Sequence, residues 1–465
     1  MSSKPSLRLT TLAALMFLAG CGSLAPVHQT PEAPVAGRFA DADAGDTGTA
    51  MPAAADLPWQ QFFASPRLKQ LIQIALDNNR DLRIATQNIE KARAAYRIQR
   101  ADRLPAINLV GSGERAPSML TGEQASTYSV GLGITSFELD FFGRVKNLAD
   151  ATLATYLGTE EARRTAQISL IANVANGYLT LLSLDEQLEL TRQTLKTREE
   201  SHDLTELQYK NGAASAMDAK QAESLVQSAR STLATLTTQR AVAKNALTVL
   251  LGQEIPPLPE GMEDSTEIVA ITDLPAGLPS ETLIRRPDIR QAEYDLRSAN
   301  ANIGAARAAF FPRITLTGTA GVGSTQLNDL FDQGKFAWTL SPQLVLPIFD
   351  YGRNKANLGV AKADREIAIA SYEKAIQTAF QEVSDALATR KGLVDQLDAQ
   401  QKLVSAENDR LDLANMRYKN GVSSYFDVLD AQRSAFSAQQ SLIEARTRQR
   451  QNLVDLYKVL GGGWQ

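Results

Sequence analysis

The chain of 465 residues has a single cysteine, Cys21, and two histidines, His28 and His202. One cysteine excludes an intramolecular disulfide and a thiolate cluster, and two distant histidines are too few for a histidine metal site. Aromatic residues are 6% of the chain, and the net charge of −4 leaves no basic excess, so we expect no nucleic-acid partner. No run of 18 apolar residues follows residue 21. If the mature chain spans a membrane, it must do so as a closed β-barrel.

Catalytic motifs are also missing. There is no P-loop, no metal-ligand spacing and no Ser-His-Asp candidate. Residues 318–323 are rich in glycine, but they end an expected strand instead of opening a helix, so a dinucleotide site is excluded. We therefore expect no enzymatic activity and no bound cofactor or metal.

Proline is absent from 118 to 255 and after Pro347. Because proline breaks helix interiors, both regions are free to be helical throughout. Within the first, residues that are apolar except for Thr191 recur at steps of three and four along two seams, Ile168, Ile171, Ala175, Tyr178 and Leu182, and Leu181, Leu184, Leu188, Thr191 and Leu195. Two such seams predict a long helix that packs against two neighbours, as in a helical tube.

The N-terminus has the pattern of an exported lipoprotein. Lys4 and Arg8 precede a short apolar run, Leu9 to Leu18, which ends in Leu-Ala-Gly-Cys at Cys21. The run is too short to span a bilayer and is typical of a signal peptide, here 1–20. We expect cleavage before Cys21 and a covalent lipid there, S-diacylglycerol on the thiol and an acyl group on the new amine. Residues 21–60, rich in Ala, Pro, Gly, Asp and Thr, should be an extended tether, and the alternative is an ordinary buried cysteine.

The remainder of the chain is one unit written twice. Asp81-Leu82-Arg83 recurs as Asp288-Ile289-Arg290, and 8 of 25 positions agree between 81–105 and 288–312. At an offset of 209, Tyr209-Lys210-Asn211-Gly212 recurs as Tyr418-Lys419-Asn420-Gly421, and 9 of 22 positions agree between 209–230 and 418–439. The sequence therefore divides into repeat 1 at 61–252, a proline-rich linker at 253–279, and repeat 2 at 280–465.

Each repeat predicts the same order of elements. A first helix, 66–100 or 280–308, leads to a β-hairpin at 105–139 or 313–347 with alternating strands of about ten residues, the length of a tilted membrane strand. A long helix, 144–209 or 353–418, and a last helix, 215–251 or 424–460, follow. Four strands cannot close a transmembrane barrel alone, since known barrels begin at eight, so a barrel needs several chains. The alternative is a pair of soluble hairpins on a coiled-coil protein.

Three segments carry a family resemblance. They are GLPSETLIRRPDIR at 277–290, NIGAARAAFFPRI at 302–314 and YKNGVSSYFDVLDAQR at 418–433. They resemble the TolC-like outer membrane factors, and the lipid-anchor motif resembles the lipoprotein branch of drug-efflux factors typified by OprM. The resemblance covers essentially the whole mature chain.

The resemblance implies a mainly α protein with a β-barrel part. It implies a homotrimeric channel-tunnel with a 12-stranded transmembrane β-barrel, four strands per chain, continued by a long α-helical coiled-coil barrel in the periplasm. The partners would be a periplasmic adaptor, an inner-membrane pump of the RND type and outer-membrane lipid. The implied function is a passive exit channel for drugs or other small toxic compounds.

The two turns between the long and last helices have a complete local explanation. Asn-Gly tolerates positive φ and terminates helices, and Ser-x-x-Asp at 215–218 and 424–427 resembles a capping box. The turns could be helix stops and starts only. The resemblance implies in addition that they form the periplasmic tips that dock the adaptor, with the tip residues Lys210, Asn211, Gly212, Ser215, Lys419, Asn420, Gly421 and Ser424.

The resemblance also places a periplasmic gate beside the second turn. Its residues would be Tyr418, Phe426, Asp427, Asp430 and Arg433, with Asp218 as the counterpart in repeat 1. Carboxylates ringed in a narrow pore repel each other and attract cations, so they could hold the gate through cations, hydrogen bonds or Arg433. Some relatives have Arg two residues after the second-turn glycine, where this chain has Ser423, so a gate bond that uses that Arg is absent.

Three other functions stay open. The same channel could serve heavy-metal efflux or type I protein secretion. Seven methionines and two histidines give no soft-metal track, which disfavours copper or silver. A lipid-anchored coiled-coil scaffold without a pore belongs to a different class.

Overall fold

A computed structural model describes residues 23–39, 54–117, 122, 124–257, 268–271, 283–332 and 334–464. The expected signal peptide and Cys21 lie outside these residues, so the lipid site stays a prediction. The chain forms two compact units. Unit 1 comprises Met1–Glu32, Thr86–Ala162 and Asp288–Ala375, and unit 2 comprises Ala33–Ala85, Arg163–Pro287 and Ile376–Gln465.

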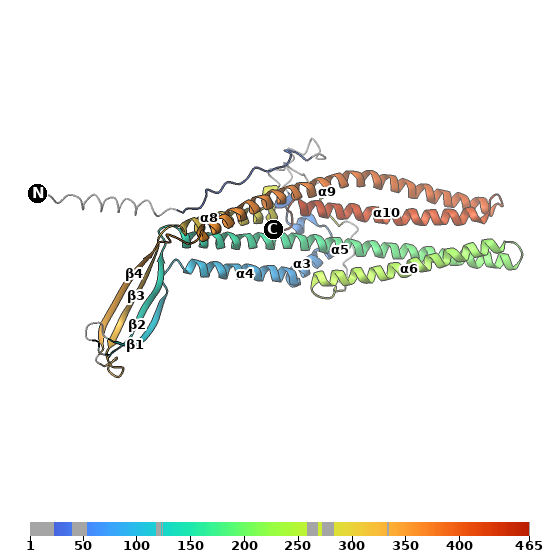
Figure 1. Cartoon of the computed structure of the whole chain (residues 1–465). Coiled ribbons are helices and arrows are strands. Elements are labelled where there is room, and N and C mark those ends of the chain that lie inside the picture. Colours follow the sequence, from blue (N-terminus) through green and yellow to red (C-terminus); the bar gives the residue numbers. More distant parts are fainter. Residues whose placement is uncertain are drawn as a thin grey trace. The chain divides into compact units, whose positions relative to one another are not determined.

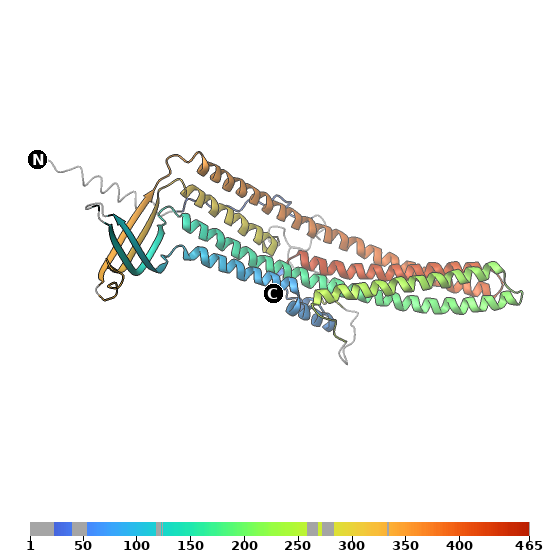
Figure 2. The same ribbon diagram turned by 60° about the horizontal axis from the view of Figure 1, so that its bottom comes forward.

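Unit 1 contains one antiparallel sheet of four strands (Figure 2). The strands are β1 (Ile107–Pro117), β2 (Gln124–Leu139), β3 (Arg313–Ser324) and β4 (Lys335–Val345), in that order across the sheet. The two hairpins expected from the sequence are thus joined to each other through β2 and β3. β1 and β4 each pair on one side only among the described residues, so the sheet has two open edges.

The sheet exposes large apolar side chains. Leu109, Leu132, Phe336, Trp338, Leu340 and Leu344 are each between 59% and 76% exposed. Where β2 crosses β3, Gly131 pairs with Gly321, and a Cβ on Gly321 would lie 2.1 Å from the carbonyl oxygen of Val130. A side chain there would force the two strands apart. An apolar surface with open edges is unstable in water and needs lipid or further protein.

An extended N-terminal segment, residues 23–32, lies against helix α8 (Pro287–Ala308) in unit 1. Arg307 donates to the carbonyl oxygen of Leu24 at 2.9 Å, and His28 Nδ1 lies 3.1 Å from the side-chain nitrogen Nδ2 of Asn300. Ser23 Oγ donates to Asn147 at 2.6 Å. The first described part of the expected tether is therefore docked on its own chain.

Two helices of equal length each contain residues of both units. α5 (Arg144–Lys210) and α9 (Arg353–Lys419) each have 67 residues, the extent that the absence of proline allows. α6 (Ala216–Leu251) and α10 (Tyr425–Val459) return from them as antiparallel partners (Figure 1). Among the described residues, no helix combines the length and apolarity required to cross a membrane. A mainly helical chain with four strands and an internal duplication is thus confirmed.

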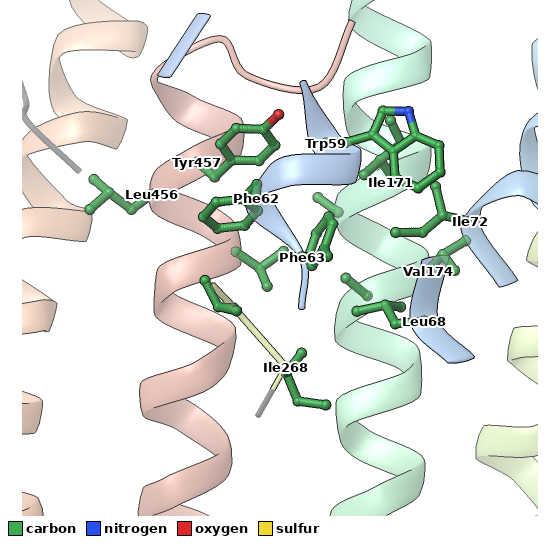
Figure 3. Packing of buried hydrophobic residues seen from close by; sticks show 14 of the residues in the cluster. Trp59, Phe62, Phe63, Leu68, Ile72, Ile171, Val174, Ile268, Leu456 and Tyr457 are labelled. Carbon is green, nitrogen blue, oxygen red and sulfur yellow. The ribbon is translucent and has the colours of Figure 1, made fainter. Parts of the chain in front are cut away.

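The core of unit 2 is built around Tyr457 of α10 (Figure 3). Phe62 stacks on its ring with the centroids 4.0 Å apart, and Phe63 meets it edge-on at 6.3 Å. The hydroxyl of Tyr457 donates to the carbonyl oxygen of Leu57 at 2.5 Å, which satisfies a buried polar group. Burial raises the pKa of Tyr457 well above its ordinary value. Ile171 of α5 lies in the same buried cluster, which therefore joins α5 of repeat 1 to α10 of repeat 2. The expected bound of the extended tether at residue 60 is wrong, because Leu57 and Trp59 are buried in this core.

One expectation about repeat 1 is wrong in detail. The continuous helix expected at 66–100 is two helices, α3 (Pro66–Asn78) and α4 (Arg80–Ala101), because Asn79 is extended and its side chain caps Leu82 N at 2.9 Å. The linker expected at 253–279 does more than connect. Ile268 is buried, and Val269 forms a β-bridge with Phe63, so these linker residues belong to the core of unit 2.

Candidate functional site: the two hairpin turns

The first turn, Lys210–Ser215, joins α5 to α6, and the second turn, Lys419–Ser424, joins α9 to α10. We call α5 with α6 the first hairpin and α9 with α10 the second hairpin. Both turns lie at the same end of unit 2 (Figures 1 and 2). All of the proposed tip and gate residues, including Asp218, therefore belong to one compact unit.

Both turns have the same backbone. Gly212 and Gly421 have φ of 75° and 69°, the left-handed region that glycine adopts without strain. Gly212 N donates to the oxygen of Tyr209 at 3.0 Å and Ala213 N to that of Gln208 at 2.7 Å. The second turn repeats these two bonds, so each long helix ends in a Schellman motif. The asparagine before each glycine adds a side-chain bond to its helix, Asn211 to Leu207 at 2.7 Å and Asn420 to Met416 at 2.8 Å.

The last helices begin differently. Ser215 and Asp218 form the expected capping box, in which Asp218 N donates to Ser215 Oγ at 3.1 Å and Ser215 N to Asp218 at 3.2 Å. The capping box expected at Ser424 is wrong, because its side chain makes no cap bond. Asp427 N donates instead to the carbonyl oxygen of Ser424 at 3.2 Å. The backbone N–H of Asp427, which the side chain of Ser424 would need as its donor, is therefore already hydrogen-bonded.

This difference separates the two equivalent aspartates. The carboxylate of Asp218 caps α6, whereas that of Asp427 is exposed and has no hydrogen bond or ion pair within the described part of the chain. Asp427 is therefore free to meet a cation or a second chain, and Asp218 has a structural task. Phe426, which precedes Asp427 in the chain, is 53% exposed.

Asp430 is held by two arginines. Arg433 donates to one carboxylate oxygen from the next turn of α10, and Arg410 of α9 donates to the other. These bonds, first that from Arg410 and then that from Arg433, hold the pKa of Asp430 below its ordinary value. Arg410 also donates to Glu407 at 3.1 Å. Asp430 and Arg433 were expected from the sequence, but Arg410 was not.

Tyr418 connects the two hairpins. Its hydroxyl donates to Gln208 Oε1 near the first turn at 3.2 Å, and its ring lies 5.0 Å from that of Tyr425. Both rings pack on the small cluster of Ala414, Val428 and Ala431. Gln208 is thus a second residue that the sequence gave no reason to select.

The tip lysines are peripheral to these contacts. Lys210 pairs with Glu206 one turn earlier at 2.9 Å, and this bond lowers the pKa of Glu206. Lys419 is exposed at the end of α9. No group of three or more His, Cys, Asp or Glu residues in the described ranges could hold a metal ion. The turns therefore present charged, exposed side chains that are suited to contact another protein.

Comparison with known proteins identifies the family. The model of the outer membrane efflux protein family matches residues 71–253 and 278–462. The chain belongs to the outer membrane efflux protein family. The two matched ranges correspond to repeat 1 and repeat 2. Channels of this family lie in the outer membrane.

Individual relatives match over nearly their full length. The probable efflux pump outer membrane protein TtgC of Pseudomonas putida is 50% identical over 466 residues, with 98% of this chain and 96% of the relative covered. The cation efflux system protein CusC of Escherichia coli is 41% identical over 459 residues, covering 98% and 99%. The open state of the MtrE outer membrane channel of Neisseria gonorrhoeae superposes with a TM-score of 0.86 at 41% identity, covering 96% and 99%.

Proposed function

We propose that three copies of this chain form the outer-membrane exit channel of a tripartite efflux pump. The observation that carries this is the four-stranded sheet with two open edges and an apolar surface, continued by helices of 67 residues. Edges β1 and β4 of neighbouring copies would pair, so that three sheets close one 12-stranded barrel. A 67-residue helix is about 100 Å long at about 1.5 Å per residue, enough to reach far into the periplasm.

The turns would then be the periplasmic tips. An adaptor protein would dock at the first and second turns and pass substrate from an inner-membrane pump of the RND type. The exposed side chains of Lys419 and Phe426 offer a charged and an apolar contact for such a partner. The energy for transport would come from the pump, and the channel would conduct passively.

A reconstitution experiment separates this function from a lipid-anchored scaffold without a pore. A channel should run on gels as a trimer that dissociates on heating, and it should conduct ions in planar bilayers. A scaffold would form no conducting species at any protein concentration, and that result would exclude the channel. A variant with Gly321→Val, which blocks the close approach of β3 to β2, is the matched negative control.

The cargo we propose is a small organic toxicant. TtgC is an efflux pump protein and CusC a cation efflux protein, and this chain resembles both over its full length, so likeness alone does not choose between them. The shortage of methionine and histidine favours organic cargo. In cells that lack their own channel, expression with the pump and adaptor encoded beside it should restore tolerance to antibiotics or solvents. Restored tolerance to copper or silver alone would assign it to metal efflux, and restored release of a secreted protein alone to type I secretion.

The gate of this channel would be formed by Asp427 and Asp430. In a trimer each occurs three times near the axis, and ringed carboxylates bind cations or donors that hold the helices together. Asp427→Ala with Asp430→Ala should raise single-channel conductance in planar bilayers. Asp412→Ala, at an exposed carboxylate on α9, is the control and should change nothing. Unchanged conductance in the double variant would remove both residues from the gate.

A further inference from the structure

Arg198 of α5 is buried without a counterion. Its exposed fraction is 4%, and it lies in the packed interior of unit 2, between the two hairpins. One terminal nitrogen donates to the carbonyl oxygen of Leu225 on α6 at 3.1 Å, and the guanidinium lies 5.0 Å from the ring centre of Phe436 on α10. Its Nε is buried with no hydrogen-bond partner, and no carboxylate pairs with it within the described residues.

Such a group is costly to bury. A guanidinium carries five N–H donors and keeps its charge, and an unpaired buried charge destabilises a protein far more than a paired one. Burial lowers the pKa of Arg198, and no carboxylate contributes an opposing effect. The packing within the described residues therefore leaves this positive charge without a counterion and its buried Nε without a hydrogen-bond partner.

A cavity of about 190 Å³ lies beside this guanidinium. Thr194 and Thr197 line it from α5, and Gln432, Phe436 and Gln439 line it from α10. Its lining contains no acidic residue, and the side-chain oxygen of Gln432 is buried without a partner. Amide nitrogen and oxygen are exchangeable in a rotated side chain, so Gln432 can also direct an N–H donor into the cavity. At about 30 Å³ per water, the space suits one small ion with a few waters.

The two repeats differ in charge at equivalent positions beside this cavity. In the first hairpin Arg230 pairs with Glu199 at 2.8 Å. At the offset of 209 the second hairpin has Gln439 donating to Asn408 at 3.0 Å, the same contact between neutral groups. The wall that the second hairpin presents to Arg198 is thus neutral where the first hairpin carries an ion pair.

We propose that the cavity beside Arg198 is an anion site whose occupant joins the first hairpin to the second. The ligand is a small inorganic anion or a carboxylate, which would accept hydrogen bonds from Arg198 and from Gln432. A free ion such as chloride and a carboxylate side chain of a neighbouring copy are the two sources of this chemistry. The site rests on the packing around Arg198 and does not depend on what the channel conducts.

The test compares anions at constant ionic strength. For the purified full chain, the temperature at which the trimer dissociates should rise with chloride or nitrate relative to gluconate, a larger and more strongly hydrated anion. Arg198→Met keeps the length and apolar stem and removes the charge, and it should abolish this dependence. Because a hydrogen bond to a charged group contributes about 1.5–3 kcal/mol, anion binding should weaken about tenfold or more. Arg230→Met is the control, since it removes an arginine that already has a carboxylate.

The variants also distinguish the two sources. If the wild type ignores the added anion, and Arg198→Met lowers the dissociation temperature of the trimer while Arg198→Lys, which keeps the charge, does not, the ligand is a neighbouring carboxylate. If the wild type responds to chloride and Arg198→Met does not, the ligand is the free ion. Should Arg198→Met fail to fold, Arg198→Lys replaces it, because lysine keeps the charge but offers one ammonium group in place of the guanidinium. The anion series on the wild type then still tests whether a free anion binds. A wild type indifferent to anions together with an Arg198→Met trimer as stable as the wild type overturns the proposal.

Discussion

Asp430 on α10 accepts a hydrogen bond from Arg410 on α9, twenty residues earlier in the chain. At the offset of 209 that relates the repeats, the corresponding positions are Ser201 and Gln221. Arg433, the second donor to Asp430, corresponds to Ser224. The electrostatic clamp therefore belongs to the second hairpin alone. The two hairpins share one backbone design but differ in what fixes the start of the returning helix.

We expect Arg410→Ala to loosen the start of α10 and raise the conductance of reconstituted channels. The effect on overall stability should be small, because Arg410 is half exposed and solvent screens pairs of this kind. Conductance in planar bilayers and thermal melting of the same preparation measure the two effects. The exchange Arg410→Asp with Asp430→Arg should return conductance toward the wild type.

The control for this clamp is Arg230→Ala, which removes the cross-helix pair with Glu199 in the first hairpin. It should leave conductance unchanged. Equal conductance gains in Arg230→Ala and Arg410→Ala would mean that any cross-helix ion pair closes the channel, and the special role of Arg410 would be lost.

The pH dependence of the clamp follows from Asp430. Its pKa is lowered in the folded protein, so its pairing is fully present above the ordinary aspartate value of about 3.9 and is lost as the pH falls through the lower folded value. Conductance should stay flat from neutral pH to about 4 and rise below it. The pH series should be measured in the Asp427→Ala variant, so that the exposed carboxylate of Asp427 does not contribute. The same series should be measured with Asp430→Asn added. Asp430→Asn should conduct more at neutral pH and respond less to acid, and an acid response of wild-type size would point to another group.

The sequence predicted the local features well and the long-range pairs poorly. Asn-Gly located both turns because the left-handed residue that ends each long helix must tolerate positive φ. Ser-x-x-Asp occurs in both repeats, yet only Ser215 forms the cap, because at Ser424 a backbone carbonyl takes the same donor. That competition depends on the tightness of the first helical turn, which the residue pattern does not encode.

Arg410 and Arg198 were missed for a different reason. Pairing between α9 and α10 depends on the register of two long helices, and burial of Arg198 depends on three. A signal was nevertheless present in the repeats. Ser201 and Gln221 become Arg410 and Asp430 together, a joint change from neutral to opposite charges at positions that must face each other if the hairpins are alike. The domain boundaries and the roles of the gate and tip residues stay predictions.

The core of unit 2 predicts a graded loss of stability at Tyr457. Tyr457→Phe removes the bond to Leu57 and should cost about 1 kcal/mol, whereas Tyr457→Ala also leaves a cavity under Phe62 and should cost about 3–5 kcal/mol. Thermal melting of the solubilised protein measures both. Near-equal losses would mean that the hydroxyl, and not the ring, carries the contact. Ile284→Ala, at a side chain 62% exposed, is the control and should change stability little.

Docking of the N-terminal segment makes Gly304 a sensitive position. A Cβ there would lie 2.5 Å from the side-chain nitrogen of Asn147 and 2.8 Å from Ala25 N. Gly304→Ala must therefore displace either Asn147 or the segment at Ala25, and overpacking of this kind costs about 1–3 kcal/mol. Limited proteolysis should then cut within residues 23–32 faster than in the wild type. Gly359→Ala, where an added Cβ meets nothing within 4 Å, should leave the cleavage rate unchanged and stabilise α9 slightly through its higher helix propensity. Equal cleavage rates in Gly304→Ala and Gly359→Ala would show that the segment does not depend on this seat.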